Sequence, residues 1–182
     1  MLGFYKDGEH PIAVDPCHLV KDVIATLSSR FASTKPHIIY DCAWQGTFAL
    51  PIRQVREALE NILGNSFESV PRQIRVRVRR SNDWRSLARS GCRISVFDDG
   101  QWMSPQHQKK AFEPFFSTKL QKGSGLGLRV SKAIVLKNGG LISLRSTDSR
   151  SRHGTCVSMF LPDRIAARTA PGIGKHKEIR GT

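Results

Sequence analysis

The most constraining feature of this sequence is a strict alternation of apolar residues and arginines from Ile74 to Arg79, which reads Ile-Arg-Val-Arg-Val-Arg. Successive side chains of a β-strand point to opposite faces, so a period of two fits a strand and does not fit a helix. One face of this strand has to be buried, and the other carries the arginines. The alternation therefore predicts a sheet with one covered face and one basic face.

The segments on either side of this strand predict the layer that covers it. Asp15-Pro16 is typical of a helix start, and apolar residues then recur at helical spacing as far as Phe31. A second amphipathic pattern follows Pro51 and continues to Phe67. The other expected elements are strands at 37–43, 46–50, 92–97, 141–146 and 155–161, a short helix at 105–111, an irregular loop at 112–124 and a helix at 125–137. Because the strands cluster, this order predicts an α+β fold, a two-layer α/β sandwich with a mixed, mostly antiparallel sheet and helices on one face.

Length, hydropathy and charge limit the class of protein. The 182 residues fit one domain. Apolar runs stay well short of the ~20 residues that span a bilayer, so we expect a cytoplasmic domain without membrane contact. Lys and Arg number 29 against 15 Asp and Glu, and the net charge of +14 attracts phosphate, nucleic acid or an acidic partner. The sequence contains no aromatic and basic recognition motif such as an RRM or a zinc finger, so we expect no nucleic acid.

The four cysteines are too widely spaced to predict a metal or redox motif. Cys17, Cys42, Cys92 and Cys156 form no Cys-x-x-Cys pair. We expect all four to be free thiols, and the last three to be small apolar residues of the core.

Three short motifs could carry chemistry. Asn61 and Asn65 stand four residues apart on one face of the second helix, where they are either half-exposed polar residues or oxygen ligands for a divalent cation. Asp98 ends a strand in an Asp-Asp-Gly sequence, which suits a turn or a carboxylate that accepts a hydrogen bond from an amine. The glycine-rich run 123–128 opens a helix, where backbone N–H groups can approach a phosphate. It lacks the context of a dinucleotide-binding motif and the lysine of a P-loop.

Taken in order, these motifs resemble the boxes of the catalytic ATP-binding domain of sensor histidine kinases. The superfamily also contains DNA gyrase B, heat-shock protein ninety and the MutL ATPases. The similar segments are 61–66 for the N box, 96–100 for the first glycine box, 112–119 for the F box and 123–128 for the second glycine box. Asn138-Gly139-Gly140 and the segment 154–162 resemble the closing elements of the family. The resemblance covers residues 15–162 and implies a Bergerat-type ATP-binding fold.

The resemblance also implies a role for each matching residue. Asp98 would bind the adenine amine, Asn65 would hold Mg²⁺, and Asn61 would line the phosphates. Lys119 and Lys122 would belong to a lid over the triphosphate of ATP, with Asn61 and Lys119 as the catalytic residues. The other implied nucleotide contacts are Gly100, Trp102, Gly123, Gly125, Leu126, Gly127, Leu128 and Thr155. Hydrolysing relatives carry a Glu where this chain has Asn61, which favours phosphoryl transfer without efficient hydrolysis.

The function implied is that of a two-component sensor histidine kinase, whose catalytic domain binds Mg-ATP and transfers the γ-phosphoryl to a histidine on another domain. None of the six histidines precedes an acidic residue, so we expect the acceptor outside this chain. We expect residues 1–14 to end a linker from a dimerisation region, 15–162 to form the catalytic domain, and 163–182 to be a basic, disordered tail. The expected partners are a histidine-containing dimerisation domain, in the same protein or in trans, and a response regulator. The isolated domain is expected to be a monomer.

Trp102 leaves a different function open. It stands where the family pattern has a second glycine in its first glycine box, and an indole there could crowd the adenine or stack on it. The alternative is a non-catalytic regulatory module of the same fold with impaired nucleotide binding. A serine kinase of the anti-sigma type shares the same boxes and is a variant of the kinase interpretation.

Overall fold

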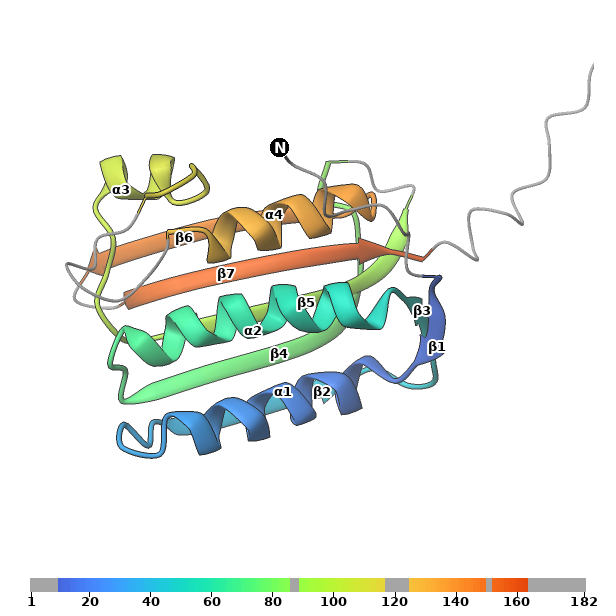
Figure 1. Cartoon of the computed structure of the whole chain (residues 1–182), viewed down its shortest axis with the longest axis horizontal. Helices are drawn as coiled ribbons and strands as arrows, with labels where there is room; N and C mark the ends of the chain where they lie inside the picture. Colours follow the sequence, from blue (N-terminus) through green and yellow to red (C-terminus); the bar gives the residue numbers. More distant parts are fainter. Residues whose placement is uncertain (1–9, 86–88, 117–124, 150–151, 164–182) are drawn as a thin grey trace, which may run out of the picture.

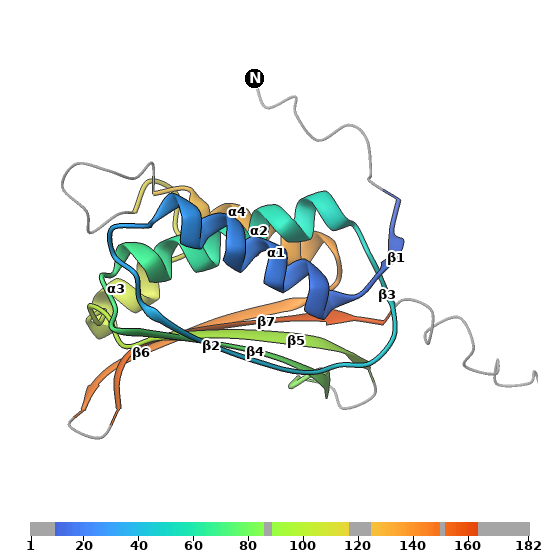
Figure 2. The same cartoon turned by 90° about the horizontal axis from the view of Figure 1, so that it is seen from below.

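The computed structural model describes residues 10–85, 89–116, 125–149 and 152–163, which form two layers (Figures 1 and 2). One layer is a five-stranded sheet in the order β2-β4-β5-β7-β6. The other consists of the helices α1 (Pro16–Arg30), α2 (Ile52–Glu68) and α4 (Gly127–Lys137), which all lie on the same face of the sheet. The predicted two-layer sandwich is confirmed.

The strand pairing is mixed, as expected. β2 (His37–Ala43) pairs in parallel with β4 (Gln73–Asn82). The pairs of β4 with β5 (Ser90–Asp98), of β5 with β7 (Arg152–Pro162) and of β7 with β6 (Leu141–Ser149) are antiparallel. A separate two-stranded sheet joins β1 (Ile12–Val14) to β3 (Phe48–Leu50). β1 falls inside the stretch 1–14 expected to be linker, and the exact domain boundary stays a prediction.

Local sequence explains where the helices begin. The Asp15 carboxylate accepts a hydrogen bond of 2.8 Å from the Cys17 backbone N–H, and Pro16 occupies the first helical position of α1. Ser104 caps the short helix α3 (Pro105–Lys110) in the same way, since its hydroxyl accepts from the His107 N–H. No helix in the described ranges is long and apolar enough to cross a membrane.

The core lies between the helices and one face of the sheet. The apolar residues of the alternating segment, Ile74, Val76 and Val78, have no exposed surface and pack in one cluster with residues of α1 and α2. Arg75 and Arg77, one position out of phase, lie on the opposite, solvent-exposed face. The covered face and the basic face are thus those that the alternation predicts.

The cysteines are only partly as expected. Cys92 and Cys156 are free thiols, and burial raises the pKa of the Cys92 thiol to about 12, so it remains protonated in the core. The expectation of free thiols is wrong for Cys17 and Cys42, which form a disulfide with their Cα atoms 6.0 Å apart. The two lie 25 residues apart, and only the packing of the first turn of α1 over β2 brings them together.

Candidate functional site

The predicted site residues gather where the end of α2, the start of α4 and the short helix α3 meet, at the left of Figure 1. β5 ends there at Asp98, beneath the last turn of α2. Lys119, Lys122 and Gly123 lie outside the described residues, so their expected part in a lid stays a prediction.

Asp98 is the most strongly fixed group of this region. Its side chain is 3% exposed, and its two carboxylate oxygens accept hydrogen bonds from the hydroxyls of Ser66 (2.9 Å) and Ser69 (2.8 Å) on α2. The Gly100 backbone N–H donates a third bond of 3.2 Å. Burial raises the pKa of the Asp98 carboxyl above its usual range, and the three hydrogen bonds offset part of that rise. A buried carboxylate held this way has a fixed direction in which it can accept one more donor.

Two glycines allow this carboxylate to sit so close to its neighbours. A Cβ atom on Gly100 would lie 2.1 Å from the Ser69 hydroxyl oxygen, so only glycine fits beside α2. Gly154 has φ +121°, and a Cβ atom there would lie 1.9 Å from the Asp98 carbonyl oxygen. The turn after Asp98 is therefore packed against both α2 and β7 through backbone contacts.

Thr155 and Ser146 extend the polar row that begins at Asp98. Thr155 lies directly opposite Asp98 on β7, and Ser146 lies opposite Thr155 on β6. The hydroxyls of Ser146 and Thr155 are 2.9 Å apart, and the Met103 backbone N–H donates to the Ser146 hydroxyl at 2.8 Å. Thr155 is buried beside Asp98, which fits the binding role expected of it.

Of the two asparagines of α2, Asn61 faces the start of α4. Both are partly exposed, one helical turn apart. A Cβ atom on Gly127, the first residue of α4, would lie 3.2 Å from the Asn61 side-chain oxygen. The structure thus brings Asn61 next to the glycine-rich run, while Asn65 precedes Ser66, one of the two serines that hold Asp98. The amide oxygens of both residues are hard ligands of the kind that Mg²⁺ prefers.

The glycine-rich run enters α4 through a left-handed residue. Gly125 has φ +63°, and a Cβ atom there would lie 2.7 Å from the carbonyl carbon of Phe115. Leu126 caps α4 without a side-chain hydrogen bond, and Leu128 packs against the core. The free N–H groups of this first turn are suited to an anion.

Trp102 is held in place on both sides but is not a core residue. The Gln101 N–H donates to the Ser69 carbonyl oxygen at 3.1 Å, and Met103 is bonded to Ser146 as described above. The indole between these anchors is 38% exposed. Trp102 therefore counts among the exposed large apolar residues and not among those of the core.

Sequence reasoning missed the serines that orient Asp98. Ser66 and Ser69 lie three residues apart at the end of α2, so their hydroxyls share the face that meets β5. The sequence shows that both serines stand close to Asn65. Serines at the end of a helix are common, however, and do not by themselves indicate that they bond a carboxylate. Gln108 was missed as well: its side-chain amide donates to the carbonyl oxygens of Met103 (2.9 Å) and Ser146 (2.7 Å), and its oxygen accepts from the Ser146 N–H.

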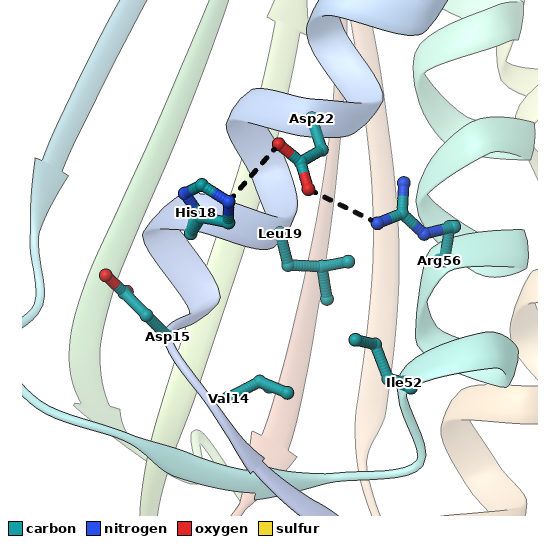
Figure 3. A pocket seen from close by; sticks show the side chains of 7 residues that line it. All are labelled: Val14, Asp15, His18, Leu19, Asp22, Ile52 and Arg56. Carbon is teal, nitrogen blue, oxygen red and sulfur yellow. Dashed lines mark hydrogen bonds and ion pairs between the residues drawn. The ribbon is translucent and has the colours of Figure 1, made fainter.

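A pocket of about 340 Å³ lies at the other end of α2 and is unrelated to these residues (Figure 3). The Asp22 carboxylate at its rim lies 3.6 Å from a His18 nitrogen and 3.5 Å from an Arg56 nitrogen. The His18–Asp22 pair lies within α1, and the Asp22–Arg56 pair joins α1 to α2; both are partly exposed, so each contributes little to stability.

The fold and the site define a class, that of nucleotide-binding α/β sandwiches with a buried carboxylate and a glycine-rich helix start. The family described as histidine kinase-, DNA gyrase B-, and HSP90-like ATPase matches residues 51–165. The chain belongs to this family.

Curated relatives at about one third identity are sensor kinases. The signal transduction histidine-protein kinase/phosphatase MprB of Mycobacterium ulcerans is 34% identical over 108 residues, which are 57% of this chain and 20% of that protein. The protein of the same name from Mycobacterium tuberculosis (strain ATCC 25177 / H37Ra) is 33% identical over 150 residues, which are 79% of this chain and 29% of that protein. The chain thus spans less than a third of the length of these relatives.

Solved structures share the fold. The mycobacterial sensor histidine kinase MprB superposes with a TM-score of 0.67 at 23% identity, over 85% of this chain and 98% of that chain. Full-length ShkA in complex with AMPPNP superposes with a TM-score of 0.69 at 20% identity, over 84% of this chain and 31% of that chain.

Proposed function

We propose that this chain is the ATP-binding catalytic domain of a two-component sensor histidine kinase. In this proposal it binds Mg-ATP at the junction of α2, α3 and α4 and transfers the γ-phosphoryl to a histidine on a separate dimerisation domain, from which a response regulator takes it. The observation that carries the proposal is the buried Asp98 carboxylate, fixed by Ser66, Ser69 and Gly100 beside the glycine-rich start of α4.

Each residue of the site has a part in this proposal. Asp98 accepts a hydrogen bond from the exocyclic amine of adenine, and its oriented carboxylate selects that amine over an oxygen acceptor. The N–H groups at the start of α4 approach the phosphates, and Gly125 and Gly127 let this helix start pack closely against Phe115 and Asn61. Lys119 and Lys122 add positive charge from the lid.

Asn61 and Asn65 suit a magnesium ion beside the phosphates, since both offer amide oxygens from one helix face. When bound, Mg²⁺ neutralises charge on the β- and γ-phosphates. Asn61 carries an amide and cannot act as a general base. The position of the helix at which hydrolysing relatives carry a glutamate therefore offers no carboxylate here. Water is therefore poorly activated, and the phosphoryl group is kept for the partner histidine.

The alternative of a regulatory module closed by Trp102 is not favoured. Its premise is an indole that blocks the adenine pocket, whereas this indole is 38% exposed. The MprB proteins of Mycobacterium tuberculosis, which match 79% of the chain, are named histidine-protein kinase/phosphatases.

Calorimetric titration with a non-hydrolysable ATP analogue and Mg²⁺ tests the proposal, using the parent chain and Trp102→Gly. We expect saturable binding in both. Binding that is absent from the parent and restored in Trp102→Gly would overturn the kinase proposal in favour of the regulatory module. A second assay adds a histidine-containing dimerisation domain and radiolabelled ATP, and phosphorylation of that domain but not of its His→Gln variant is the expected result.

A further inference from the structure

The face of the sheet opposite the helices carries a patterned set of arginines that the nucleotide site does not use. Three successive rows of paired residues cross this face in the order β2, β4, β5, β7, β6. They are Ile39, Arg75, Phe97, Cys156, Arg145, then Asp41, Arg77, Ser95, Ser158, Ser143, and then Ala43, Arg79, Arg93, Phe160, Leu141. We call these fifteen residues the arginine face. Figure 2 shows no described helix over it.

The charge of the arginine face is strongly unbalanced. It holds five guanidinium groups and one carboxylate, that of Asp41. Asp41 pairs with Arg79 and lies 3.5 Å from the Arg77 Nε atom. Within the described part of the chain, neither Arg75 nor Arg145 contacts a carboxylate, and both are exposed. A partner that covered this surface would take the guanidinium groups out of water, which costs free energy unless the partner supplies negative charge. The surface is therefore suited to an anionic partner.

The middle row differs from its neighbours because three of its side chains, on β5, β7 and β6, are serines. The hydroxyls of Ser95 and Ser158 lie 2.8 Å apart at the centre of the sheet, and Ser143 follows them on β6. Serine hydroxyls can donate hydrogen bonds to carboxylates. The row places such donors between arginines on both sides.

We propose that the arginine face docks an extended acidic segment of a partner protein. Arg75, Arg77 and Arg79 follow one another at two-residue intervals along β4, which is a spacing of about 6.8 Å. An extended segment presents alternate side chains on one side at the same interval. Carboxylates at alternate positions of such a segment can therefore meet successive guanidinium groups, which bind carboxylates bidentately.

Two other polyanions fit this face less well. Single-stranded nucleic acid needs open aromatic rings on which bases stack. Of the aromatic rings on or beside this face, Phe160 is buried, Trp84 lies under the Arg93 guanidinium at 5.0 Å, and Phe97 is only partly exposed, which leaves no row of open rings among the described residues. An anionic membrane is flat, whereas a five-stranded sheet is twisted, so few of the arginines would reach the same plane of head groups.

The test is fluorescence anisotropy with a labelled peptide of alternating Glu and Thr, at about 0.15 M ionic strength. The comparison peptide has the same composition, but its Glu residues stand in one block. We expect the alternating peptide to bind more tightly to the parent chain. Arg75→Gln/Arg77→Gln should weaken that binding by about tenfold, since two successive charge contacts along β4 are lost. The matched control, Lys21→Gln/Arg30→Gln, removes the same charge from the exposed side of α1 and should leave the affinity within about twofold.

Three outcomes would overturn the proposal. They are equal affinity for the two peptides, equal loss in the two double variants, and tighter binding of oligo-dT or of phosphatidylserine vesicles than of the alternating peptide. Because Arg75 and Arg77 lie on the far face from Asp98, binding of the ATP analogue should be unchanged in Arg75→Gln/Arg77→Gln. The two proposals can thus fail independently.

Discussion

Replacing Asp98 by asparagine is the sharpest perturbation of the proposed nucleotide site. The side chain keeps its shape, and an amide can still bond Ser66, Ser69 and the Gly100 N–H because the serine hydroxyls can rotate to accept. What is lost is the negative acceptor for the adenine amine. A hydrogen bond to a charged group contributes about 1.5–3 kcal/mol. We therefore expect the affinity for the ATP analogue to fall by about 10- to 150-fold in Asp98→Asn.

Asp99 provides a matched control in the adjacent position. Its carboxylate accepts hydrogen bonds from the backbone N–H groups of Arg72 (2.9 Å) and Gln73 (2.8 Å), at the start of β4. Asp99→Asn removes the same charge but not the proposed contact, so its affinity should stay within about twofold of the parent. Calorimetric titration of both variants measures the difference. Equal affinities of the two variants would refute the assignment of Asp98 as the adenine acceptor.

Three further predictions follow from the same region. In Asn65→Ala, the gain in nucleotide affinity on adding Mg²⁺ should disappear while binding in EDTA persists; a gain equal to that of the parent would exclude Asn65 as a ligand. Gln108→Ala removes three hydrogen bonds to Met103 and Ser146 and should lower the free energy of unfolding by roughly 1–3 kcal/mol in urea titrations; faster hydrogen exchange at the Ser146 amide would be the local sign, and parent-like exchange would contradict it. The Asp98 carboxyl has a raised pKa, so the folded state binds its proton more tightly than the unfolded state; stability from this group should be present at low pH and fall as the pH rises from about 4 through the raised pKa, and Asp98→Asn should lack that fall.

The sequence predicted the helices and strands better than it predicted which segments pair or bond with each other. The alternation at 74–79 located β4 and both faces of the sheet, since period two has one interpretation in a half-buried strand. The two-stranded sheet of β1 and β3 was not predicted, because three-residue strands carry too little pattern to show what they pair with. The disulfide was missed for the same reason, as contacts between residues 25 apart depend on packing.

The candidate site was predicted through its motifs and not through its contacts. Asp98 and Asn61 stood out because their neighbours in sequence form recognisable boxes. Ser66, Ser69 and Gln108 bond groups 29 to 38 positions away, and no local pattern records such a pairing. Hydrogen-bond partners across a fold become visible only when the strand register is known.

That register also explains how one strand can serve two surfaces. On β5, Phe97 belongs to the arginine face and Asp98 to the nucleotide site, because consecutive side chains point to opposite sides of the sheet. The covered side fixes the phase: Ile94 and Val96 must face the helices, so Asp98 must as well. A slip of one residue would expose those apolar residues and turn the carboxylate away from Ser66. The burial of the core therefore sets the direction of the Asp98 carboxylate, and the arginines on the opposite side of the sheet stay accessible to the proposed partner when nucleotide occupies the proposed site.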